Sequence, residues 1–323
     1  MKIGLIDLDN TRFPNIALMK ISGFYKSLGC DVDWYSPFEG HYDKVYISRV
    51  FSFTPDYAYF IDADEIIKGG SGYAISVDPD GKEVYDPAKD TPLPPEIEST
   101  YPDYTLYPEA TKDTAYGFLT RGCPRGCGFC IVGAKEGRCS RQVAQLSDFY
   151  RGQKNIVLCD PNILACKDSV KLLKELAETK ARVNFNQGLD IRLMTEEKAK
   201  LIDQIRVKEI HFARDRYEDK NIILPKLKMF TEICHHKAHG QNATVYTIVN
   251  YDTTIEQDLE RIYTLRDLNY WAYVMIYDKQ HAAPEYKRLQ RWCNMRAVFG
   301  AVPNFEDYKK SKRAAEVNGL FSI

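Results

Sequence analysis

The segment Thr120-Arg-Gly-Cys-Pro-Arg-Gly-Cys-Gly-Phe-Cys-Ile-Val132 carries Cys123, Cys127 and Cys130 in the spacing Cys-x3-Cys-x2-Cys. Three thiolates so close in sequence are able to converge on one small group, and soft thiolates select zinc, copper(I) or iron–sulfur clusters. A structural zinc site usually has four ligands, and the sequence has no fourth Cys or His at finger-like spacing; Cys139 is a weak candidate. Three ligands suit a four-iron cluster in which one iron stays open to another ligand.

A regular alternation of strands and helices surrounds this segment. Strands are predicted at residues 115–119, 155–159, 183–186, 209–213, 243–249 and 271–277, each followed by a helical pattern. Such alternation indicates a parallel sheet, either open or closed into a partial barrel with helices outside. The chemistry of these sheets gathers at the carboxyl ends of the strands. We also expect Ser140 to cap a helix that carries Leu146 and Phe149.

The residues that precede the cysteine segment fall into two regions of different composition. Strands predicted at residues 2–8, 32–35, 44–48 and 57–61, with a helix from Pro14, indicate a small Rossmann-like α/β domain over residues 1–77. Seven of the 15 prolines then lie between residues 79 and 108. Proline excludes a continuous helix or a central strand, so we interpret residues 78–112 as an ordered crossing segment or linker. We expect residues 113–293 to form the main α/β domain and residues 294–323 to form a C-terminal extension.

Composition narrows the class of protein. The 323 residues are 44% hydrophobic, which is enough for a sizeable core, and the net charge is −1. A near-neutral chain gives no general attraction to nucleic acid, so a nucleic-acid polymer is not the expected partner. No apolar run reaches membrane-spanning length. Nine cysteines, an odd number without a recognisable signal peptide, favour reduced thiols and a cytoplasmic location over a disulfide framework.

The cysteine segment resembles the cluster motif of radical S-adenosylmethionine (SAM) enzymes, and the resemblance covers residues 113 to about 293. The details are most similar to the branch with methylthiotransferases and cobalamin-associated members. There the motif reads Arg-Gly-Cys-Pro-x-x-Cys-x-Phe-Cys and is followed by a Ser-Arg pair, here Ser140-Arg141. The run from Gly188 to Glu197 also resembles that branch, and Val249–Leu259 is a degenerate version of a further segment. The implied fold is a partial (β/α)6 barrel.

The resemblance implies roles for individual residues. Cys123, Cys127 and Cys130 would ligate three irons of an oxygen-sensitive [4Fe-4S] cluster, and the fourth iron would bind SAM. Candidate SAM contacts are Phe129 in the cysteine segment and the strand-end residues Asp160, Asn162, Gln187, Asp190, Arg192 and Arg214. Arg192 suits a carboxylate because guanidinium forms a bidentate fork. The fourth strand departs from the family pattern, since it ends Phe212-Ala-Arg-Asp-Arg216.

Residues 1–77 resemble a degenerate cobalamin-binding (B12-binding-like) domain. The loop after the first strand reads Asp7-Leu-Asp-Asn-Thr-Arg-Phe-Pro14 and lacks the cobalt-ligating His of the family's Asp-x-His-x-x-Gly loop. His41 is the only His of this region and lies outside that motif. Bound cobalamin is therefore not expected, and we expect a domain that helps to close the active site.

Three functional hypotheses remain. The first is a radical SAM enzyme that abstracts hydrogen from a small-molecule or nucleoside-like substrate and takes electrons from a flavodoxin or ferredoxin. The second is a cobalamin-dependent radical SAM methyltransferase. The third is a non-catalytic iron–sulfur or zinc protein. The catalytic residues that act on the substrate, and the substrate itself, are not indicated by the sequence.

Overall fold

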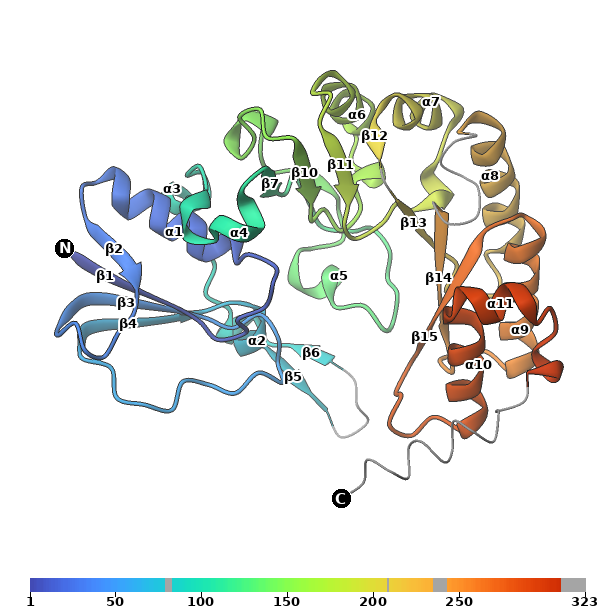
Figure 1. Ribbon diagram of the computed structural model, residues 1–323, viewed down its shortest axis with the longest axis horizontal. Helices are drawn as coiled ribbons and strands as arrows, with labels where there is room; N and C mark the ends of the chain where they lie inside the picture. The colour runs from blue at the N-terminus through green and yellow to red at the C-terminus, as the bar shows by residue number, and fades with distance from the viewer. Residues whose placement is uncertain (79–82, 208, 235–242, 309–323) are drawn as a thin grey trace. The chain divides into compact units, whose positions relative to one another are not determined.

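The computed structural model describes residues 1–78, 83–207, 209–234 and 243–308 (Figure 1). The chain forms two compact units, Met1–Ile210 and His211–Ile323. The division at residue 210 falls inside residues 113–293, which were predicted to form one domain. The predicted domain boundaries at residues 77, 112 and 293 stay predictions. Both units are mixed α/β structures whose principal sheets are parallel, which confirms the predicted α/β class.

The first unit begins with a four-stranded parallel sheet of order β2-β1-β3-β4. Its strands are β1 (Lys2–Asp7), β2 (Asp31–Trp34), β3 (Tyr42–Ser48) and β4 (Ala63–Gly69). Helix α1 (Ile16–Ser27) starts after the cap residue Asn15, whose side chain accepts from the backbone of Leu18. Leu18, Met19 and Ile21 of α1 pack on Ile3 and Leu5 of β1 and form the core of this region.

One predicted strand of this sheet is wrong. Residues 57–61 form a loop, and β4 comes from the following, more charged stretch, Ala63-Asp-Glu-Ile-Ile-Lys-Gly69. As an edge strand, β4 pairs only with β3 and exposes much of its surface, so it needs neither apolar alternation nor a continuous apolar run. The aromatic residues of 57–61 are mostly exposed, although Ile61 reaches the core.

The proline-rich region is ordered where the structure describes it. It contains β6 (Glu83–Tyr85), α3 (Pro95–Glu98) and α4 (Pro108–Thr111). Just before it lie α2 (Ser71–Ala74) and β5 (Ile75–Val77), and β5 pairs antiparallel with β6. Asp103 fastens the region to α1 through Ser22 and Lys26, both at 2.7 Å. Burial opposes ionisation of Asp103, but these partners hold its pKa at about 2. Tyr104 donates to the carbonyl of Phe149 at 2.7 Å and so ties the region to the next sheet.

That next sheet is also parallel and has the order β12-β11-β10-β7. Its strands are β7 (Thr114–Gly117), β10 (Asn155–Leu158), β11 (Arg182–Phe185) and β12 (Arg206–Val207), with helices α6 (Ser169–Glu178) and α7 (Glu196–Gln204) between the later ones. The expected helix after Ser140 is wrong. Residues 141–142 pair with residues 120–121 instead, and only a short 3-10 turn follows at Leu146–Asp148.

The second unit contains a three-stranded sheet of order β13-β14-β15, in which β14 and β15 are parallel. The strands are β13 (Ile210–Ala213), β14 (Ala243–Val249) and β15 (Trp271–Ile276), and the helices are α8 (Lys220–Ile233), α9 (Ile255–Asp267), α10 (Pro284–Asn294) and α11 (Arg296–Ala301). The predicted capping box from Thr254 to Gln257 opens α9. Strand β13 starts on the last residue of the first unit.

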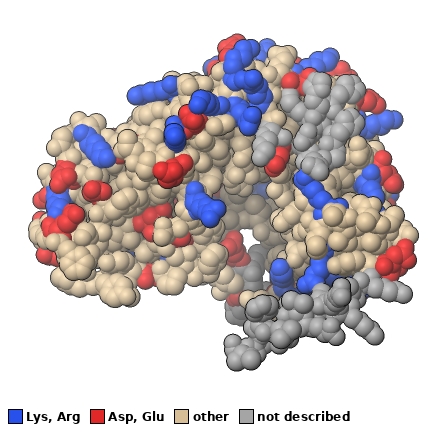
Figure 2. Space-filling model, in the orientation of Figure 1, with Lys and Arg blue, Asp and Glu red and all other residues tan. Residues whose placement is uncertain are grey.

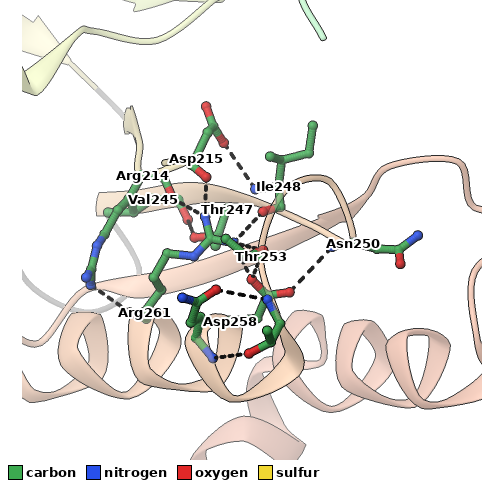
Figure 3. Close-up of polar contacts among 11 residues, drawn as sticks. Arg214, Asp215, Val245, Thr247, Ile248, Asn250, Thr253, Asp258 and Arg261 are labelled. Carbon is green, nitrogen blue, oxygen red and sulfur yellow. Dashed lines mark hydrogen bonds and ion pairs between the residues drawn. The ribbon is translucent and has the colours of Figure 1, made fainter. Parts of the chain in front are cut away.

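A buried arginine joins the carboxyl ends of β13 and β14 to α9 (Figure 3). Arg261 donates to the carbonyl oxygens of Arg214 at 2.9 Å and Ile248 at 2.7 Å, and it forms an ion pair with Asp258. Both side chains of this pair are fully buried. Asp258 also accepts from the Thr253 hydroxyl at 2.5 Å, so the buried charges are hydrogen-bonded as well as paired.

Acidic and basic side chains both occur over each unit on the face that Figure 2 shows, in keeping with the net charge of −1. Within the described ranges, every helix is too short or too polar to cross a membrane.

We expect Asp258→Ala to lower the free energy of unfolding of the second unit by about 3–5 kcal/mol, because it leaves the Arg261 charge buried without its partner. Urea unfolding followed by tryptophan fluorescence in a Trp34→Phe background measures this, since the other tryptophans, Trp271 and Trp292, lie in that unit. The exposed Glu256 of the same helix provides the control, and Glu256→Ala should change stability by no more than about 0.5 kcal/mol. Equal effects of the two variants would contradict the assigned role of the pair.

Candidate functional site

The predicted cluster cysteines lie in residues 122–140, which we call the cysteine loop. A two-stranded antiparallel hairpin of β8 (Thr120–Arg121) and β9 (Arg141–Gln142) closes it. Inside this closure, Cys123 donates its backbone N–H to the Gly137 carbonyl at 3.1 Å. Gly122 has φ +88°, and a Cβ at this position would lie 2.3 Å from the Cys139 carbonyl oxygen. Only glycine fits there, so the sequence Gly-Cys is a requirement of the loop's closure.

Asp160 anchors the entrance to the cysteine loop from the end of β10. Its carboxylate accepts from the backbone N–H of Leu119 at 3.1 Å and of Thr120 at 2.5 Å, and from the Thr120 hydroxyl at 2.6 Å. Burial raises the pKa of Asp160 to about 6, against the effect of these hydrogen bonds. The structure therefore gives Asp160 a positioning role, and its predicted contact with SAM stays a prediction.

Asp190 connects the end of β11 with the cysteine loop. It accepts from Nε of Arg125 at 2.8 Å, from Nε of Arg192 at 2.7 Å and from Nδ2 of Asn162 at 3.2 Å. Burial would raise the pKa of Asp190, but the two arginines lower it below its ordinary value. The carboxylate is thus held ionised between groups from three segments, and it fixes Arg192 and Asn162, two other predicted site residues.

Asn162 is the residue that reaches the cysteine sulfur. Its Nδ2 lies 3.5 Å from Sγ of Cys123 and also donates to Asp190, which fixes the orientation of the amide. The opposite atom, Oδ1, is buried and has no hydrogen-bond partner in the described part of the chain. A buried acceptor without a partner costs free energy, so this atom marks a position where a ligand with an N–H or O–H donor fits.

The three thiols are not gathered around one point. Cys123 and Cys127 are half-buried and Cys130 is exposed. Across the described ranges, no three His, Cys, Asp or Glu side chains are arranged to hold a metal ion. The residues nevertheless fit a thiolate-bound cluster, because three thiols lie in one closed loop and the acceptor Oδ1 of Asn162 lies near the first of them, Cys123.

The remaining predicted contacts of the first unit lie near these groups in sequence. Phe129, between the second and third cysteines, is half-buried, and Gln187, just after β11, is exposed. Neither position adds evidence for a contact with SAM, so both stay predictions.

Arg214 is held by the helix that covers its sheet, and its predicted contact with SAM stays a prediction. The side chain is fully buried and donates to the Arg261 carbonyl at 3.2 Å and to the Thr264 hydroxyl of α9 (Figure 3). Burial and the neighbouring Arg261 lower its pKa to about 10. Its guanidinium therefore packs against the helix that covers the sheet.

Two residues of the site were missed by sequence reasoning. Arg125 lies between two cysteines, where its position inside the motif was the only available signal, and its partner Asp190 is 65 residues away. Lys135, in the short helix α5 (Val132–Lys135), donates to the Ser71 hydroxyl of α2. Burial lowers the pKa of Lys135. This contact joins the cysteine loop to the helix that follows the N-terminal sheet.

Comparison of the chain with protein-family models and with curated proteins finds no match.

We expect Asp160→Ala to loosen the entrance to the cysteine loop, because the buried N–H groups of Leu119 and Thr120 lose their acceptor. Each unsatisfied buried donor costs about 1–3 kcal/mol, so these amides should exchange with solvent at least ~10-fold faster. Hydrogen–deuterium exchange resolved to the peptide of residues 115–125 measures this. Asp168→Ala is the control, because Asp168 precedes α6 without a side-chain capping bond. Unchanged exchange in Asp160→Ala would contradict the anchoring role.

Proposed function

We propose that the chain is a radical SAM enzyme that uses a [4Fe-4S] cluster and SAM to abstract hydrogen from a small-molecule or nucleoside-like substrate. The observation that carries the proposal is the pairing of Cys123 with Asn162. A thiol of the three-cysteine loop lies 3.5 Å from an oriented amide whose oxygen is buried and has no partner among the described residues. A cluster with an open iron, together with a ligand that carries an amino group, accounts for both halves of this arrangement.

The residues of the loop and of the strand ends have separate tasks in this proposal. Cys123, Cys127 and Cys130 would hold three irons. When bound and reduced, the cluster supplies the electron that cleaves SAM into methionine and a 5′-deoxyadenosyl radical, which abstracts hydrogen from the substrate. Oδ1 of Asn162 would accept from the SAM amino group, and Asp190 would keep the Asn162 amide turned that way. Arg192, held by Asp190, is the nearest candidate for the SAM carboxylate.

The fold supports the proposal without deciding it. Strands β7, β10, β11 and β12 lie parallel in chain order in one unit. In the other, β13, β14 and β15 also follow chain order, and β14 and β15 are parallel. Asp160, Asn162 and Asp190 all follow the carboxyl ends of their strands, where α/β sheets carry their chemistry. We also propose a partial (β/α)6 barrel, a cytoplasmic location, and a flavodoxin or ferredoxin as the electron donor.

Anaerobically reconstituted and reduced protein should convert SAM into 5′-deoxyadenosine, and Cys127→Ala should abolish this because the cluster loses a ligand. Chromatography of the reaction mixture and iron analysis of the protein measure the two effects together. Cys139→Ala is the matched control, since Cys139 lies in the same loop and is exposed, and it should keep iron and activity. Zinc in place of iron, or loss of metal on replacing Cys139 as readily as Cys127, would favour a four-ligand zinc site and contradict the proposal.

Asn162→Ala should weaken SAM binding by up to about tenfold, since the loss of one hydrogen bond from the iron-bound, uncharged amino group costs about 0.5–1.5 kcal/mol. The iron content should stay near that of the unchanged protein, because Asn162 is not a cluster ligand. Equilibrium binding of SAM to the reconstituted protein measures the effect. Asn186→Ala provides the control, as Asn186 is exposed beyond the end of β11. Equal SAM affinity in both variants would remove Asn162 from the site.

A further inference from the structure

The N-terminal sheet carries a cavity that the proposed chemistry does not use. Its volume is about 760 Å³, and it lies at the carboxyl ends of β1 and β2, under the turn into α4. Pockets of roughly 300–1,000 Å³ are typical of small-molecule sites. Open parallel α/β sheets bind their ligands outside the carboxyl ends of the strands. Size and position together therefore indicate a binding site, and none of its lining residues belongs to the cysteine loop or to Asn162 and Asp190.

The walls of this cavity are aromatic. Trp34, Tyr35, Tyr57 and Tyr107 come from three segments of the chain and all line it. They support one another edge to face, with ring centroids 5.3 Å apart for Trp34 and Tyr107 and 6.1 Å apart for Tyr35 and Tyr57. Rings held in this way offer a preformed apolar surface to a flat molecule, and stacking of a base on an aromatic side chain contributes about 1–3 kcal/mol.

The polar groups of the cavity define the charge of its ligand. Asp7 ends β1 and accepts from the Tyr107 hydroxyl through Oδ2 at 2.7 Å. Over the ranges that the structure describes, no group donates to its Oδ1, which stays available as an acceptor. The lining also contains Glu109 and one cation, Arg12. Two carboxylates against one guanidinium repel a phosphate and favour a neutral ligand with N–H or O–H donors.

We propose that this cavity binds an uncharged nucleoside, with its base against the aromatic walls and a base N–H or ribose hydroxyl donating to Asp7. A nucleoside has a flat base that stacks on the aromatic residues and several N–H and O–H donors for the carboxylates. It lacks the negative phosphate charge that these carboxylates repel. The site requires neither cluster nor SAM, so its failure and the failure of the proposed radical chemistry are separate results.

Isothermal titration of the full chain, without reconstitution, with adenosine, guanosine, cytidine and uridine tests the proposal. At least one of them should bind with a sub-millimolar dissociation constant. Tyr57→Ala should weaken that binding about tenfold, which corresponds to about 1.4 kcal/mol, through loss of aromatic surface. Asp7→Ala should weaken it by a similar factor through loss of the acceptor. Phe38→Ala is the matched control and should leave it unchanged, because Phe38 is an exposed aromatic residue of the same sheet region outside the cavity.

Several results would overturn the assignment. They are the absence of binding for all four nucleosides, 5′-monophosphates that bind as tightly as the nucleosides, and a loss of affinity in Phe38→Ala that equals the loss in Tyr57→Ala. Tight binding of hydroxocobalamin that excludes the nucleosides would assign the cavity to a corrinoid instead. The circular dichroism spectrum of each variant shows whether it folds. If the variant at Tyr57 or the variant at Asp7 misfolds, the other still tests whether nucleosides bind in this cavity.

Discussion

A single buried carboxylate, Asp190, determines how the candidate site is assembled. It is paired with Arg125 from the cysteine loop and with Arg192 from its own turn, and it orients Asn162 from the neighbouring strand end. Removing a carboxylate from between two partly buried arginines would leave their charges uncompensated. The site therefore depends on Asp190 ionised, and the lowered pKa of this group means that the stability it contributes is complete above its ordinary range and is lost as the pH falls through the lowered value.

The cysteine loop itself is held at its entrance and at one point within. Asp160 fixes the backbone before Cys123, while Gly122 allows that backbone to pass close to Cys139. Cys127 and Cys130 lie further along the loop in a stretch rich in glycine, and among the described residues the three thiols are not arranged as a metal site. Such a loop suits a group that gathers its own ligands when it binds.

Sequence reasoning predicted the regular elements well wherever the signals were local. The main strands after residue 114 follow the apolar runs predicted for them, although the two-residue strand β12 was not predicted. Helices α9 and α10 begin at the predicted capping box and proline. It failed where distant pairing decides the local structure. Residues 141–142 became a strand because they meet residues 120–121, and β4 formed from a charged stretch because it lies at an edge.

Contacts between residues distant in sequence also explain why only part of the candidate site was predicted. The cysteines were recognisable from spacing alone, but the contact of Arg125 with Asp190 joins residues far apart in the chain and leaves no periodic signal. Arg214 was predicted as a ligand contact because it ends a strand. Its contact with α9 joins residues far apart in the chain and left no signal in the sequence, and its predicted contact with SAM stays a prediction.

An anaerobic crystal structure of the reconstituted protein with SAM provides the decisive test of the proposed site. We expect a four-iron cluster on Cys123, Cys127 and Cys130, with the SAM amino group on the open iron and within hydrogen-bonding distance of Oδ1 of Asn162. A metal held by four thiolates that include Cys139, or SAM bound away from Asn162, would contradict it.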